Sequence, residues 1–97
     1  MTSQNPIPTT IDLRKYIDTT FYAERPHIRG RRVLVSMIAA NARENDWSAA
    51  RLAHEFSLTE EQILAALLYY HEYKTEIDQQ DVEEQQRFDE AYAHQHE

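Results

Sequence analysis

The sequence predicts a small, mainly helical domain built around a helix-turn-helix, with a short β-hairpin before it and an extra helix after it. The chain has 97 residues and no cysteine, which suits one domain with a modest core and excludes disulfides and thiolate metal sites. Apolar residues recur at helical spacing from Leu34 onward, and capping residues divide that stretch into separate helices. The only glycine, Gly30, lies between two short runs of β-forming residues.

The chain is expected to form one domain with two appendages. Residues 1–10 are polar and contain two prolines, so we expect a flexible lead-in there. Residues 11–78 are expected to form the domain, and residues 79–97 an acidic C-terminal tail helix.

A hairpin is predicted around Gly30. Pro26 prevents a helix from running through Arg25. A single glycine between the β-prone residues 26–28 and 32–35 marks a turn that requires a positive φ.

The first two helices are predicted from an apolar stripe and a cap. Leu34, Ile38 and Ala42 share one face of a helix that ends near residues 45–46. Ser48 is a good N-cap for a second, short helix. The inner face of that helix would hold Leu52, Ala53 and Phe56.

A longer helix follows the turn at residues 57–58. Thr59 and Gln62 have the spacing of a capping box at its start. Its main apolar face is expected to hold Ile63, Leu67 and Tyr70, with Leu64, Leu68 and His71 beside it.

The last predicted helix, near residues 77–92, is rich in Glu and Gln. Its apolar residues are sparse, at Val82, Phe88 and Tyr92, so this helix must be stabilised by packing on the body or on a partner. We expect Tyr69, Tyr73, Phe88 and Tyr92 to contribute interface contacts, because tyrosines bury area while keeping a solvated hydroxyl.

Charge is divided unevenly along the chain. Residues 1–53 carry a balance of +3 and residues 54–97 a balance of −10. The one basic concentration surrounds the predicted hairpin, and it would supply nucleic-acid contacts from Arg25, His27, Arg29, Arg31 and Arg32. Two alternatives are a solvated face and salt bridges to the acidic tail.

The start of the long helix is poorly suited to DNA. In a helix-turn-helix, the first turn of the second helix enters the major groove. Here that turn carries Glu60 and Glu61, which phosphates repel and which the helix dipole favours at this position. Any DNA contact is therefore expected from the arginines of the hairpin.

Two stretches resemble the signature of the domain of unknown function 433 family. They are residues 23–35, AERPHIRGRRVLV, and residues 58–70, LTEEQILAALLYY, with a Ser-x-x-x-Ile-Ala-like block at 48–53 between them. The family pattern reads Gly-Gly-x-Pro-x-Ile-x-Gly-Thr-Arg-Ile-x-Val, then Leu-Thr-x-Glu-Gln-Val-x-Ala-Ala-Leu-x-Tyr-Tyr. The paired glycines are replaced by Ala23 and Glu24, and the threonine by Arg31. The resemblance covers about residues 11–78.

This resemblance implies a homeodomain-like three-helix bundle that dimerises and acts as an antitoxin. Many members look like partners of PIN-like toxins, which are ribonucleases with acidic sites. We therefore expect an antitoxin-like regulator, a homodimer that binds DNA through its basic hairpin and a PIN-like toxin through its acidic surface. The alternative is a protein–protein interaction module that binds no DNA.

Other chemistry is not supported by any motif. The sequence contains no glycine-rich phosphate loop and no catalytic triad pattern, so a small hydrolase is the remote third alternative and we expect no enzyme and no cofactor. His94 and His96 would point to different sides of a helix, so no metal site is expected. The absence of a signal-like start, of an apolar span and of cysteine favours a cytoplasmic protein without membrane contact.

Overall fold

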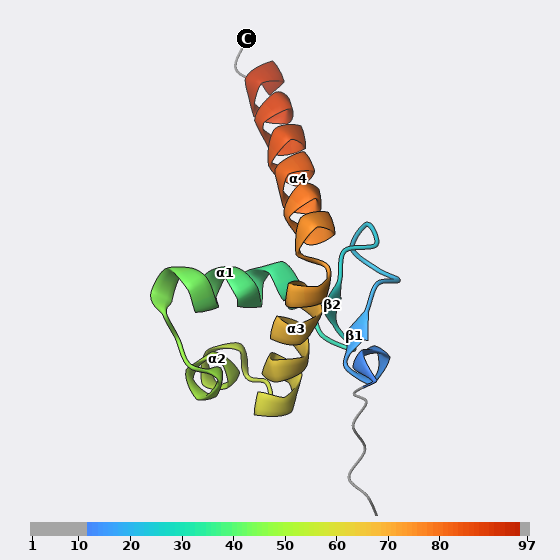
Figure 1. Cartoon of the computed structure of the whole chain (residues 1–97). Helices are drawn as coiled ribbons and strands as arrows, with labels where there is room; N and C mark the ends of the chain where they lie inside the picture. The colour runs from blue at the N-terminus through green and yellow to red at the C-terminus, as the bar shows by residue number, and fades with distance from the viewer. Residues whose placement is uncertain (1–11, 96–97) are drawn as a thin grey trace, which may run out of the picture.

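The computed structural model describes residues 12–95 and is mainly helical (Figure 1). Its elements are η1 (Leu13–Lys15), β1 (Ile17–Asp18), β2 (His27–Ile28), α1 (Val35–Asn45), α2 (Ala49–Phe56), α3 (Glu60–Glu72) and α4 (Lys74–Gln95). The predicted fold class, a helical domain with a small antiparallel hairpin and an extra C-terminal helix, is confirmed. The lead-in expected at residues 1–10 lies outside the described residues.

The hairpin pairs strands that lie further apart in the chain than we expected. β1 and β2 are antiparallel, with Ile17 opposite Ile28 and Asp18 opposite His27. The predicted turn does occur at Gly30, whose φ is 79°. The run after it contributes a single bridge, from Leu34 to His27, because α1 begins one residue later.

The core forms where α3 meets the other elements. In Figure 1, α3 lies between the pair α1 and α2 on one side and the hairpin on the other, and it contacts all of them. The buried cluster consists of Ile17, Ile28, Val35, Ile38, Leu52, Ala53, Ile63, Ala66 and Ile77. Burial of this apolar surface is the main force that holds α1, α2, α3, the base of α4 and the hairpin together.

The predicted helix caps are formed. The Ser48 hydroxyl accepts a hydrogen bond of 3.1 Å from the backbone N–H of Arg51 at the start of α2. At the start of α3, Thr59 Oγ1 accepts from the Gln62 N–H at 3.1 Å, and Gln62 Oε1 accepts from the Thr59 N–H at 2.8 Å. These side chains satisfy N–H groups that have no partner within the helix.

One residue, Tyr73, separates α3 from α4. Its φ and ψ of −120° and 32° end α3, and α4 begins at Lys74. The side chain of Ile77 is buried and fixes the base of α4 on the body. α4 then runs unbroken past residue 78, where we expected the tail to begin, and projects away from the bundle (Figure 1).

Candidate functional site

Arg25, the first of the predicted nucleic-acid residues, holds α4 to the body. Its guanidinium donates to Asp81 of α4 and, at 3.2 Å, to the Ser36 hydroxyl near the start of α1. Only 16% of its side chain is exposed. The alternative of a salt bridge to the acidic tail of the same chain is therefore confirmed for this arginine.

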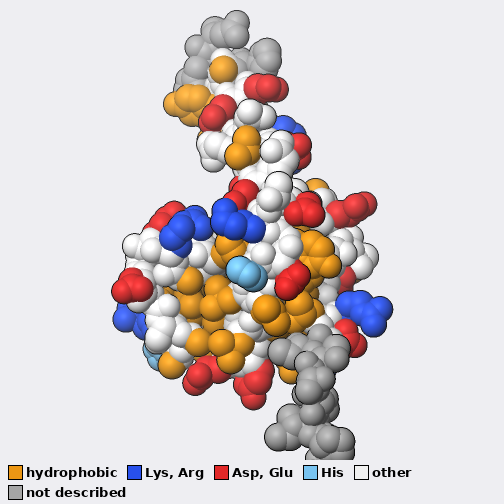
Figure 2. All heavy atoms as spheres, in the orientation of Figure 1, with side chains coloured by type: hydrophobic (Ala, Val, Ile, Leu, Met, Phe, Trp, Pro, Cys, Tyr) orange, Lys and Arg blue, Asp and Glu red, His pale blue; other side chains and the backbone are white. Residues whose placement is uncertain are grey.

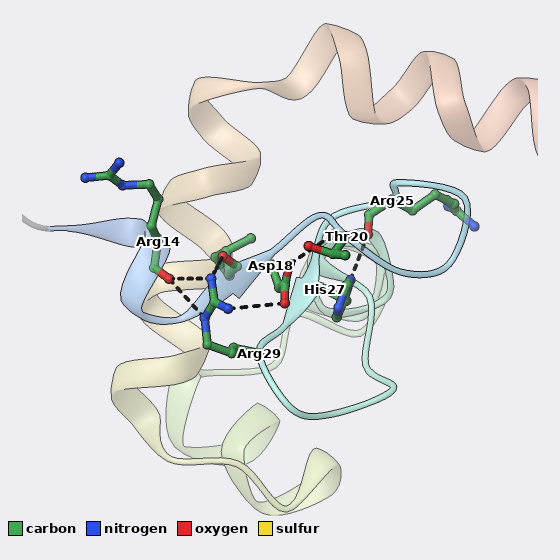
Figure 3. A network of polar contacts seen from close by, with 7 residues as sticks. Arg14, Asp18, Thr20, Arg25, His27 and Arg29 are labelled. Carbon is green, nitrogen blue, oxygen red and sulfur yellow. Dashed lines mark hydrogen bonds and ion pairs between the residues drawn. The ribbon is translucent and has the colours of Figure 1, made fainter.

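Arg29 closes the N-terminal segment onto the hairpin. Its guanidinium donates to the Arg14 carbonyl at 2.8 and 3.1 Å, to the Ile17 carbonyl at 3.3 Å and to the Asp18 carboxylate at 3.2 Å. Figure 3 shows the guanidinium between the Arg14 carbonyl and Asp18. The Asp18 carboxylate also accepts hydrogen bonds from Thr20, which, with the nearby Arg29, hold the pKa of Asp18 below its ordinary value.

Arg31 caps the turn of the helix-turn-helix. It donates to the carbonyls of Ser57 and Phe56 at 2.9 and 3.2 Å. These carbonyls lie at the C-terminal end of α2, where the helix provides no N–H partners and where a cation is favoured by the helix dipole.

His27 and Arg32 complete the predicted set and differ in exposure. His27 is 2% exposed, its Nδ1 lies 2.9 Å from the Arg25 carbonyl, and the Tyr22 ring packs against it with centroids 4.8 Å apart. Arg32 is exposed and makes no hydrogen bond or ion pair within residues 12–95. Four of the five groups thus have partners inside the protein, and Arg32 alone remains for an external anion.

The turn before Arg25 is strained. Tyr22, Ala23 and Glu24 have φ values of 59°, 59° and 63°, in the left-handed region that favours glycine. Ala23 and Glu24 occupy the positions at which the family pattern that this chain resembles has paired glycines. Their positive φ values explain a preference for glycine there. A run of left-handed residues other than glycine persists only where surrounding contacts impose it.

A groove adjoins this turn, between the start of α1 and α4. Its volume is about 470 Å³. The groove is lined by the apolar side chains of Leu34, Met37, Ala40 and Phe88, and by Arg25, Ser36, Asp81, Glu84 and Gln85. A further hollow of about 420 Å³ continues it past Leu34 toward Tyr22 and Arg32. The combination of an apolar floor with charged edges suits an amphipathic segment of another protein.

The four predicted interface residues fall into two groups. Tyr69 and Tyr73 stack with ring centroids 4.6 Å apart, and burial raises the pKa of the half-buried Tyr69 hydroxyl. Phe88 and Tyr92 lie on the projecting part of α4, 63% and 56% exposed. The structure does not bring the two groups together.

A polar network fixes the base of α4. Asp78 accepts hydrogen bonds from the Tyr70 hydroxyl at 2.8 Å and from Lys74 Nζ at 2.7 Å. The hydrogen bond from Lys74, followed by that from Tyr70, lowers the pKa of Asp78, and the same contact raises the pKa of Lys74. With Ile77 beneath it, this network sets the direction in which α4 leaves the bundle.

Sequence reasoning missed the groove residues Met37 and Asp81. Met37 lies on α1 next to Ile38 of the core stripe, yet it is 41% exposed and lines the groove. A usable signal was present, because Asp81 and Phe88 are seven residues apart and so share one face of a helix.

Two further properties concern residues 12–95 only. Within that range, no group of three or more His, Asp or Glu side chains could hold a metal ion. No helix in the same part of the chain has the length and apolar character needed to cross a membrane.

Comparison with known proteins gives one match. Residues 17–70, more than half of the chain, match the model of the family described as protein of unknown function (DUF433). No curated protein and no solved structure matches the chain.

Proposed function

The chain belongs to the DUF433 family of unknown function, and from its geometry we propose that it is a protein-interaction module. In this proposal, α4 and the groove beside Arg25 bind a basic, amphipathic segment of a partner protein. The observation that carries the proposal is the projection of α4 from the bundle with Val82, Phe88 and Tyr92 exposed (Figure 1).

The projecting part of α4 gains little from the body. Beyond Asp81, its side chains are exposed as far as residue 93. Helices shorter than about 12–15 residues are marginal in water without packing, and this segment is rich in Glu and Gln rather than alanine. A partner that covers Phe88 and Tyr92 would supply the missing burial.

Charge determines the kind of partner. Residues 74–95 contain seven Asp or Glu and two Lys or Arg. Two such helices repel each other, so this element favours a basic surface over a second copy of itself. The groove adds an apolar floor of Met37 and Ala40 beside the carboxylates of Asp81 and Glu84.

An antitoxin role is the specific form of this proposal that the family resemblance suggests. The partner would then be a PIN-like ribonuclease toxin, bound through a basic segment along α4. DNA binding has less support, because Arg25, Arg29 and Arg31 already donate to groups within the protein. The start of α3 also presents Glu60 and Glu61 to solvent.

The test is calorimetric titration of the full chain with a PIN-like protein encoded beside it. We expect binding that weakens as the salt concentration rises. The substitution Phe88→Ser should raise the Kd by about tenfold or more, because an exposed aromatic anchor is lost. Phe21→Ser is the matched control, because Phe21 is equally exposed, at 61%, and does not line the groove. Equal affinity of Phe88→Ser and the wild-type chain would contradict the use of α4, and no binding at low salt would contradict the antitoxin form.

A further inference from the structure

A second surface, separate from the projecting part of α4, is the outward face of α3. Leu64 and Leu68 are 55% and 37% exposed there, although Ile63 and Ala66 of the same helix are fully buried. With Tyr16, Ala65 and Glu61, the two leucines line a shallow apolar pocket of about 290 Å³. Figure 2 shows hydrophobic side chains gathered over α3 on this face of the molecule.

This face has an arrangement that fits a copy of itself. Leu64 and Leu68 are spaced equally on either side of Ala66, and so are Glu61 and His71. All four outer positions lie on one side of the helix, because residues three and four apart are neighbours on a helix surface. Glu61, Leu64, Leu68 and His71 are all exposed.

A two-fold axis that passes between Leu64 and Leu68, at the level of Ala66 along the helix but on the opposite side from that buried residue, would therefore match each group with a suitable partner. Two α3 helices packed antiparallel about that axis would place Leu64 of one copy against Leu68 of the other. The same operation sets Glu61 opposite His71 of the second copy, and it aligns the helix dipoles antiparallel. The face would thus pair leucine with leucine, and a carboxylate with an imidazole that can donate a hydrogen bond to it.

We propose that the outward face of α3 is the homodimer interface, formed by antiparallel packing of the Leu64–Leu68 stripe against a second copy of this chain. This surface is distinct from α4, whose negative charge disfavours self-association. It also differs from the tyrosine contacts expected from the sequence, because Tyr69 packs on the core and on Tyr73. A phosphate backbone does not suit this face, since Glu60 and Glu61 border the leucines.

The choice of a second copy over another protein rests on the register. A heterologous partner places no requirement on the spacing of Glu61 and His71 about Ala66, whereas a two-fold interface requires each group to meet its complement at the same distance from the axis. Tyr16, from the segment just before β1, widens the apolar patch and gives the interface area beyond one helix.

Sedimentation of the full chain at several concentrations tests this proposal. We expect a reversible dimer whose Kd rises by about tenfold or more in Leu64→Glu, because an unpaired carboxylate would be buried. Val82→Glu is the matched control, since Val82 is similarly exposed on α4 and lies outside the interface. Circular dichroism of each variant checks that the fold is retained.

A charge exchange tests the register. Glu61→Lys alone should weaken the dimer, and the double variant Glu61→Lys with His71→Glu should restore it, because each new pair is again complementary. A wild-type monomer at high concentration, or a Leu64→Glu dimer as strong as wild type, overturns the proposal. Failure of the double variant to recover overturns the antiparallel register. Because Phe88 and the groove are untouched in these variants, the result is separate from that of the titration with a toxin.

Discussion

Arg25 and Asp81 form an ion pair that joins the loop before β2 to α4. It connects the strained turn to the helix that carries the proposed binding surface. The Arg25 side chain is mostly buried, whereas Asp81 is about half exposed. This one contact therefore couples the N-terminal hairpin region to the C-terminal helix.

Removal of that ion pair should loosen α4. We expect Arg25→Met to lower the free energy of unfolding by about 1–2 kcal/mol, because a charged hydrogen bond is lost and Asp81 keeps access to water. Hydrogen exchange of α4 amides should increase more than that of α3. Arg32→Met, at an exposed arginine with no such contact among the described residues, should leave both quantities unchanged; equal effects of the two substitutions would show that the ion pair is unimportant.

Glycine in the left-handed turn should stabilise the protein. Glu24→Gly removes a side chain from a residue with a φ of 63°, where residues other than glycine are strained by about 1–2 kcal/mol. The greater freedom of glycine in the unfolded chain offsets part of this gain, so we expect a net increase of up to about 1 kcal/mol in urea unfolding. Ala50→Gly, at an exposed position in α2, is the control and should destabilise the protein.

Stability should fall in acid partly through Asp78. Hydrogen bonds from Lys74 and Tyr70 lower the pKa of Asp78 in the folded protein. The carboxylate therefore contributes its full stabilisation at pH values above its ordinary, unfolded-state pKa, and this stabilisation is lost as the pH falls through the folded-state pKa. The effect is small, since the carboxylate is well solvated. In unfolding measured between about pH 2 and pH 6, Asp78→Asn should flatten the slope. Asp89→Asn, which affects an exposed carboxylate further along α4, should leave the slope as it is.

Duplex DNA should not bind measurably, even at low ionic strength, where phosphate contacts are strongest. Our reason is that the arginines near the hairpin are occupied within the protein, apart from Arg32. An electrophoretic shift assay with DNA from the gene's own promoter region checks this. A shifted band that disappears as salt rises, and that Arg32→Ala removes, would support the DNA-binding hypothesis instead.

The local signals in the sequence predicted the helices well. Ser48, Thr59 and Gln62 act through contacts within three residues, so their spacing alone indicated where α2 and α3 begin. Gly30 marked its turn for the same reason, since a positive φ is a property of one residue. The break at Tyr73 carries no glycine or proline, so no residue type marks it in the sequence; the contacts that fix α4 beyond it, from Ile77 and Asp78, are tertiary.

The partners of the arginines could not be predicted in this way. Arg31 meets carbonyls at residues 56–57, and Arg25 meets Asp81, so both contacts depend on the tertiary fold. A cluster of four arginines has the same composition whether it faces solvent or holds the chain together. The leucines of α3 show the same limit. The sequence shows that the helix has many apolar residues, but not that Leu64 and Leu68 are the ones left exposed.

The cap that Arg31 places on the Phe56 and Ser57 carbonyls has a consequence for chimeras between relatives. The donor and the acceptors lie in separate segments, so the helix-turn-helix cannot be transferred to another protein without the loop that carries Arg31. A graft that imports residues 48–70 alone keeps its fit only where the recipient has an arginine at the position of Arg31. The interchangeable unit is therefore the loop and the turn together, inherited as a pair.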